Sequence, residues 1–226
     1  MDILKTDHDA LIRQFAEASA AQGEALQEAV RDAMLRALQG RELTLKSTID
    51  TLQAVVAAAS AGVAQNPSGA LGRVQLLAEA VEGMDAAMVR IIDVHRRTLQ
   101  HLFEQGADLR TPQIRDAVEQ VEGLESAFFA AMDRAAEASA PPMHGPWVDA
   151  IRAFRQAGTS SGPSAKTAVE QLMSQTKQAA ADGRALGQHA TQAILDHYAT
   201  LASGVLMGMC EAMSSAAYLA PSPDGE

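Results

Sequence analysis

Apolar residues recur every three or four positions along most of this 226-residue chain, which is the pattern of amphipathic helices. The pattern predicts helices over about 7–39, 42–64 and 69–105 and a fourth helix that begins at Thr111 and Pro112. Between 42 and 64 the apolar positions alternate by four and three along one face; they are Leu45, Ile49, Leu52, Val56, Ala59 and Val63. The first 139 residues therefore predict a bundle of about four helices.

The segment 140–164 interrupts this rhythm with prolines and glycines. Pro141, Pro142 and Pro146 fall close together, and a short helix is expected only over about 147–156. The string GTSSGPS, Gly158–Ser164, has the composition of a flexible linker. We therefore predict that 140–164 connects the bundle to the last part of the chain.

The last predicted element is a long amphipathic helix over about 165–220 that packs on the bundle. Its apolar positions follow steps of 4-3-4, an 11-residue period of about 3.67 residues per turn that keeps them on one side of a nearly straight helix. They are Leu172, Thr176, Ala179, Gly183, Gly187, Ala190, Ile194, Tyr198, Leu201, Val205, Met209, Ala212 and Ala216. A straight helix of this length would extend roughly 80 Å.

The apolar stripe of this last helix changes character along its length. Gly183 and Gly187 are close-packing positions, where a neighbouring backbone can approach. From Ile194 onward the stripe carries larger side chains and forms a candidate apolar interaction face; its members are Ile194, Tyr198, Leu201, Val205, Met209 and Met213. The sequence leaves open whether this face packs within the chain or against a partner.

Together these patterns predict an all-α protein, an elongated antiparallel helical bundle with a long C-terminal helix. No segment alternates as a strand would. The 46 alanines favour helix throughout, and the low aromatic content of 4% argues against a pocket-rich enzyme. Residues 221–226 are expected to form a disordered tail.

The charge and cysteine content exclude several classes of partner. A net charge of −10, with no dense basic cluster, argues against binding to nucleic acid. The single cysteine, Cys210, allows neither an intramolecular disulfide nor a cysteine-based zinc site, and its helical context favours a buried hydrophobe over a redox or lipidated thiol.

The six histidines do not have the spacing of a helical metal site. His95 falls on the apolar stripe of the third helix, where a hydrogen-bonded core histidine is favoured over a ligand. We expect no metal and no cofactor.

Gly158–Gly162 matches the G-x-S-x-G nucleophile pattern with Ser160 in the serine position. That motif requires a preceding strand, whereas the residues before it look helical, so the linker interpretation is favoured. We expect no catalytic residues.

No stretch combines the length and apolarity of a membrane span, which needs about 18 or more apolar residues. The N-terminus lacks the basic and apolar regions of a secretion signal. These observations predict a cytoplasmic protein.

The residues KTAVEQLMSQTKQAAADGRALGQHATQAILDHY, Lys166–Tyr198, resemble the phasins, helical bacterial proteins that coat polyhydroxyalkanoate granules. A looser similarity covers Leu43–Gln65, so that about a quarter of the chain is involved. The resemblance implies a protein without catalytic residues that binds a hydrophobic surface.

Three functions are consistent with the sequence. The first is a non-enzymatic helical interaction protein, phasin-like, that coats or binds a hydrophobic surface such as a granule. The second is a self-associating helical scaffold or adaptor, a homo-oligomer with no granule role. The third is an enzyme whose site the sequence does not reveal.

Overall fold

The computed structural model describes residues 3–21, 24–39, 42–104, 112–181, 198 and 201–209 of the chain. Within these residues every regular element is a helix and no strand occurs, so the all-α prediction is confirmed for this part of the protein. The labelled helices are α1 (Ile3–Ala20), α2 (Ala25–Leu38), α3 (Leu45–Ala64), α4 (Ala70–Glu104), α5 (Pro112–Ala138), α6 (Pro141–Ala157) and α7 (Ser161–Ala181). A further helix covers residues 201–209.

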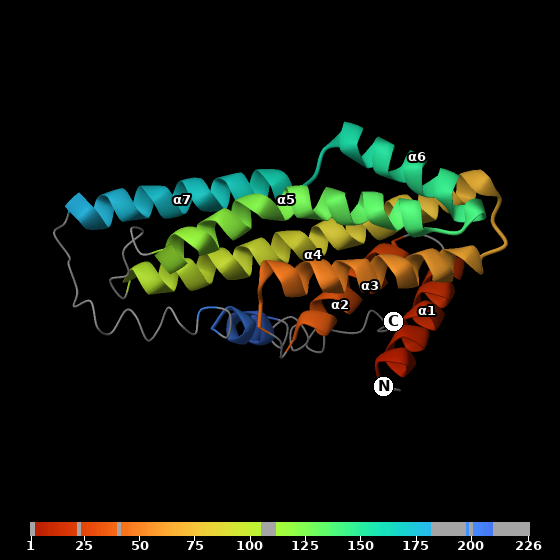
Figure 1. Ribbon diagram of the computed structural model, residues 1–226, viewed down its shortest axis with the longest axis horizontal. Coiled ribbons are helices and arrows are strands. Elements are labelled where there is room, and N and C mark those ends of the chain that lie inside the picture. The colour runs from red at the N-terminus through yellow and green to blue at the C-terminus, as the bar shows by residue number, and fades with distance from the viewer. Residues whose placement is uncertain are drawn as a thin grey trace, which may run out of the picture.

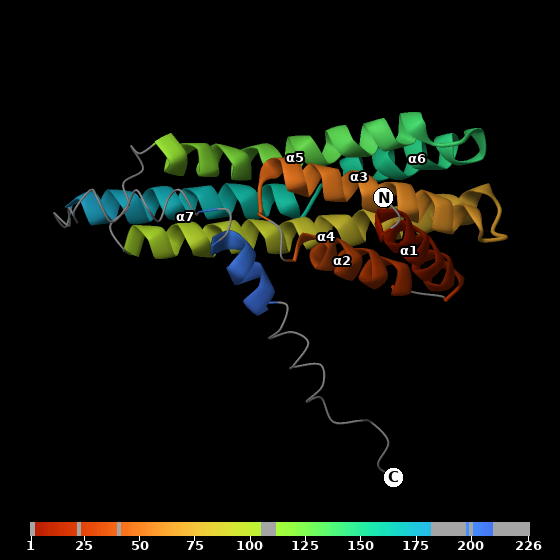
Figure 2. The same ribbon diagram turned by 60° about the horizontal axis from the view of Figure 1, so that its bottom comes forward.

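The helices α3, α4, α5 and α7 run roughly along the long axis of the molecule, with α3 and α7 at opposite halves of it (Figures 1 and 2). The 35-residue α4 is the longest element and packs against α2, α3, α5, α6 and α7. Its apolar face is buried along most of its length, as the stripe of the 69–105 segment predicts. Five of the six other labelled helices thus pack on α4, and α1 is the exception.

The segment expected as one helix over 7–39 is two helices instead. α1 packs mainly along α3, whereas α2 packs mainly along α4, so the two halves of the segment cover different neighbours. One straight helix could not reach both partners in this way. A glycine at position 23 was the available sequence signal for the break.

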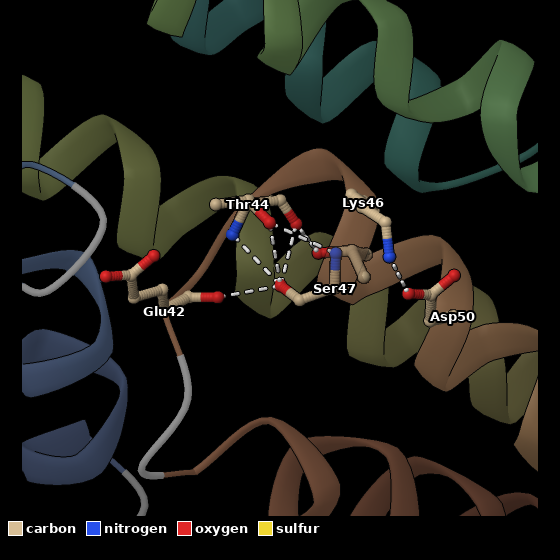
Figure 3. Close-up of polar contacts among 6 residues, drawn as sticks. Glu42, Thr44, Lys46, Ser47 and Asp50 are labelled. Atoms are coloured by element: carbon tan, nitrogen blue, oxygen red, sulfur yellow. Dashed lines mark hydrogen bonds and ion pairs between the residues drawn. The ribbon is translucent and has the colours of Figure 1, made fainter.

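The start of α3 is fixed by a capping box (Figure 3). Thr44 Oγ1 accepts from the backbone N–H of Ser47 at 3.1 Å, and Ser47 Oγ accepts from the backbone N–H of Thr44 at 3.0 Å. These bonds satisfy N–H groups that have no partner within the helix. On the exposed side, Lys46 and Asp50 form an ion pair at 2.8 Å.

The main core is built from aliphatic residues and a few aromatic rings. Trp147 of α6 is fully buried, and its Nε1 donates to Ser60 Oγ of α3 at 3.2 Å. Phe128 and Phe154 join α5 to α6, with ring centroids 6.1 Å apart. A second, smaller cluster lies where α4 and α5 meet α7 and consists of Leu99, Leu102, Phe103, Ala117, Val118 and Leu172.

Most of the predicted 140–164 linker is helical. α6 begins at Pro141, because proline is compatible with the first turn of a helix, where its missing N–H would have no partner. α6 therefore extends before and after the short helix expected over 147–156. The non-helical connection to α7 is limited to Gly158–Ser160, and Gly158 has a positive φ of 86° that ends α6.

The structure does not have the single straight C-terminal helix that the sequence predicts over 165–220. Val169 of α7 and Tyr198 both pack against the smaller cluster, although 29 residues in a straight helix would separate them by roughly 43 Å. The described stretches Ser161–Ala181 and 201–209 are therefore not parts of one rod. Residues 182–197, 199–200 and 210–226, including the expected tail, lie outside the described residues.

Gly83 allows α2 and α4 to approach closely. A Cβ atom at Gly83 would lie 2.3 Å from the carbonyl oxygen of Gln27, which is backbone and cannot rotate away. We expect Gly83→Ala to lower the free energy of unfolding by about 1–3 kcal/mol, the usual cost of overpacking. Urea denaturation followed by circular dichroism measures the change.

The matched control is Gly123→Ala in α5, where an added Cβ would meet no atom within 4 Å. Alanine is the better helix former, so this control is expected to raise the free energy of unfolding by up to about 1 kcal/mol. Equal effects of the two substitutions would contradict the close approach at Gly83.

Candidate functional site

The start of α7 is held by a buried carboxylate from α4. Asp85 is 4% exposed, and its oxygens accept from the backbone N–H of Ser160 at 2.7 Å and of Ser161 at 3.2 Å. These N–H groups carry the partial positive charge of the helix N-terminus, which a carboxylate stabilises. The GTSSGPS string is thus anchored by a residue 75 positions earlier in the chain.

A second carboxylate approaches the same turn from α5. Thr159 Oγ1 donates to Glu125 Oε1 and accepts from the backbone N–H of Gly162 at 3.0 Å. A Cβ at Gly162 would lie 2.3 Å from Glu125 Oε1, so glycine leaves the space that this carboxylate occupies. The glycines, threonine and serines of the string therefore join α4, α5 and α7.

Ser160 has a structural setting that differs from a nucleophile elbow. It follows helix α6 and precedes helix α7, its side chain is exposed, and its backbone N–H is bonded to Asp85. A nucleophile elbow places the serine on a strained turn between a strand and a helix. The arrangement is that of a helix cap.

His95 and Tyr198 form the polar contact between α4 and the C-terminal part of the chain. His95 Nδ1 and Tyr198 Oη lie 2.7 Å apart, and the two rings stack with centroids 5.8 Å apart. Burial lowers the pKa of His95 from its ordinary value of 6.5 to about 4 and raises the pKa of Tyr198. At neutral pH the imidazole is uncharged, so the tyrosine hydroxyl can donate to its unprotonated nitrogen.

Four of the six positions of the predicted apolar face are among the residues that the structure describes. Tyr198 packs against the smaller cluster, Val205 and Met209 pack against the main core, and Leu201 is 39% exposed. Ile194 and Met213 lie outside the described residues, as do the close-packing positions Gly183 and Gly187 and the thiol of Cys210. Three of the four described positions of this face thus contact the chain's own core, and Leu201 does not.

The 201–209 helix is rotated relative to the orientation that the stripe suggested. Its most deeply buried side chains are Ala202 and Leu206, which lie beside the stripe positions Leu201 and Val205 in the sequence. Met207, 41% exposed, lies on the solvent side with Leu201. The figures place this helix beside the connection between α2 and α3 (Figures 1 and 3). Because all of these residues are apolar, the 3.6-residue period alone did not fix which would face the core.

Among the described residues, no group of three or more His, Cys, Asp or Glu side chains is placed to hold a metal ion. None of the described helices has the length and apolarity needed to cross a bilayer. A shallow hollow of about 460 Å³ lies beside the start of α3, lined by Thr44, Leu45, Lys46, Ile49, Asp50 and Gln120. Because this hollow is open and its Lys46–Asp50 ion pair is exposed, it is not a buried reaction centre.

The role of Asp85 is tested by replacing it with asparagine. The amide keeps one acceptor oxygen but loses the charge, so we expect Asp85→Asn to lower the free energy of unfolding by about 1–3 kcal/mol. Asp149→Asn, which alters an exposed ion pair on α6, is the control and is expected to change it by no more than about 0.5 kcal/mol. Equal losses in urea denaturation would show that Asp85 does not anchor α7.

The buried His95 predicts a pH dependence of stability. Its pKa is about 4 in the folded protein and near 6.5 when unfolded, so between these values the unfolded chain binds more protons. The free energy of unfolding should therefore fall as the pH drops from 6.5 to 4, by roughly 3 kcal/mol from this group. Urea denaturation at several pH values should show a smaller slope for His95→Gln, and an unchanged slope would contradict the burial of a neutral histidine.

Comparison with known proteins shows the family of this chain. No curated protein and no solved structure matches it. Residues 2–215 match the model of a family of unknown function, DUF6781. Because this match covers nearly the whole chain, the protein belongs to the DUF6781 family.

Proposed function

We propose that this protein is a non-enzymatic helical interaction protein that binds a hydrophobic surface, in the manner of the phasins on a polyhydroxyalkanoate granule. The observation that carries the proposal is the 201–209 helix, which directs Ala202 and Leu206 into the core while Leu201 and Met207 remain exposed. This helix can therefore contact an external apolar surface through Leu201 and Met207 while Ala202 and Leu206 stay packed in the protein's own core.

The contact between this helix and the core supports exchange with an external surface. Leu206 is its one large, fully buried side chain among the described residues, and burying a leucine contributes about 1.5–3 kcal/mol. An apolar surface would supply a similar free energy per unit area to the same side chains. The helix could thus turn its buried face to a granule at small net cost.

In this proposal the remaining helices form an elongated, largely antiparallel bundle that carries the C-terminal segment. Met173 on α7 is 44% exposed and adds apolar area outside the core. The protein would lie in the bacterial cytoplasm, with its C-terminal segment at the granule surface.

Self-association as a scaffold is the second candidate. Gly204 and Gly208 lie on the exposed side of the 201–209 helix, and a Cβ at either would meet no atom within 4 Å. A helix from a second copy could approach this side closely. This alternative predicts a dimer or larger species by light scattering and no affinity for apolar particles.

Binding to apolar particles tests the proposed function. We expect the protein to sediment with polyhydroxybutyrate granules or polystyrene beads, and the double variant Leu201→Ser/Met207→Ser to bind several-fold more weakly, because it removes exposed apolar area. The matched control is Leu71→Ser, which removes an 88% exposed leucine at the start of α4.

Circular dichroism is expected to be the same for all three proteins. If the wild-type protein stays in the supernatant, the surface-binding proposal is wrong. If Leu71→Ser weakens binding as much as the double variant, the 201–209 helix is not the binding element.

A further inference from the structure

A groove of about 540 Å³ runs between α3 and α5 and ends at the beginning of α6. Its volume lies within the range of small-molecule sites, about 300–1,000 Å³. The α3 residues that line it extend from Gln53 to Ala64, which corresponds to roughly 17 Å along the helix. The groove is thus long enough for an extended chain molecule.

The groove exists because both facing helices carry alanine there. Seven alanines line it, six of them on α3 and α5; the seven are Ala57, Ala61, Ala64, Ala131, Ala135, Ala138 and Ala140. Val56 and Met143 also line the groove and are buried, and Ser60 accepts a hydrogen bond from Trp147 at 3.2 Å. Elsewhere between the helices larger side chains such as Leu52 and Phe128 fill the space, as the usual close packing of protein interiors requires.

One cation lies at this apolar groove. Arg134 is the only charged residue among the described residues that line it, and no carboxylate lines it there. Arg134 forms no ion pair or hydrogen bond with another described residue, whereas its neighbour Asp133 is paired with Arg155 at 2.7 Å. The chain as a whole has a net charge of −10, so a groove with apolar walls and one arginine is a local exception. Such a groove complements a ligand with one negative charge and a long apolar part.

We propose that the groove binds a dissolved linear fatty carboxylate, with its hydrocarbon tail along the alanines and its carboxylate at Arg134. The guanidinium can hold a carboxylate with two parallel hydrogen bonds. The smooth alanine walls suit an unbranched tail better than a folded peptide, whose side chains would need separate pockets. The site lies on α3 and α5 and does not depend on the surface binding proposed for residues 201–209.

Isothermal titration of the full chain with decanoate, kept below its micelle-forming concentration, tests the proposal. We expect saturable binding of one decanoate per chain and weaker binding of 1-decanol, which has the same tail without the charge. Arg134→Gln should weaken decanoate binding by roughly threefold to fivefold, as expected for an exposed ion pair. Arg90→Gln, an exposed arginine of α4 outside the groove, is the matched control and should leave it unchanged.

A second variant tests the part of the groove in which the hydrocarbon tail would lie. Ala61→Leu places a larger side chain in the groove and should abolish decanoate binding, whereas Ala153→Leu, on the exposed side of α6, should not. Circular dichroism establishes that each variant is folded. If Ala61→Leu does not fold, the titration of Arg134→Gln alone decides whether decanoate binds in the groove.

Several results would overturn the proposal. These are the absence of saturable decanoate binding, equal affinity for decanol and decanoate, and equal affinity of Arg134→Gln and the wild type. Binding only to phosphatidylglycerol vesicles, with none to dissolved decanoate, would also overturn it and would assign the apolar surface to lipid instead.

Discussion

The structure depends on the burial of one face of α4. Along this single helix, Gly83 permits the close approach of α2, Asp85 anchors the start of α7, and His95 bonds to Tyr198. Each contact is of a different kind: a missing side chain at Gly83, a charge at a helix N-terminus, and a hydrogen bond between buried His95 and half-buried Tyr198. Because all three lie on the same helix, a change in the packing of α4 would affect α2, α7 and the C-terminal segment together.

The helices themselves could be predicted from the sequence, because the period of apolar residues and the positions of glycine and proline depend on local physics. The positions of α3 and α4 agree closely with the segments 42–64 and 69–105. The break between α1 and α2 was missed, because alanine-rich sequence continues on both sides of Gly23 and the helix propensity hardly changes.

The course of the C-terminal part could not be predicted, because a periodic stripe shows which side of a helix is apolar but not where the helix ends. The 4-3-4 pattern includes both Leu172 and Tyr198 without a break, yet these two residues meet in one cluster. The anchored GTSSGPS string was missed for a related reason. Its composition is that of a linker, and the carboxylates of Asp85 and Glu125 that hold it are far away in sequence.

Side-chain size explains both proposed binding surfaces. Where alanines face large side chains, the helices pack into a continuous core; where alanines face alanines, between α3 and α5, a groove remains. In the 201–209 helix, Leu206 is the one large residue that is fully buried, and Leu201 and Met207 leave apolar area exposed on the other side. Modest burial of this kind is what an interaction protein needs if it is to exchange internal contacts for external ones.

The central functional claim is that this chain binds the surface of an apolar body inside the cell. A fluorescent fusion of the full chain, imaged in bacteria with and without polyhydroxyalkanoate granules, tests it most directly. Fluorescence should concentrate around granules where they are present and spread through the cytoplasm where they are absent. Uniform fluorescence in granule-filled cells would contradict it.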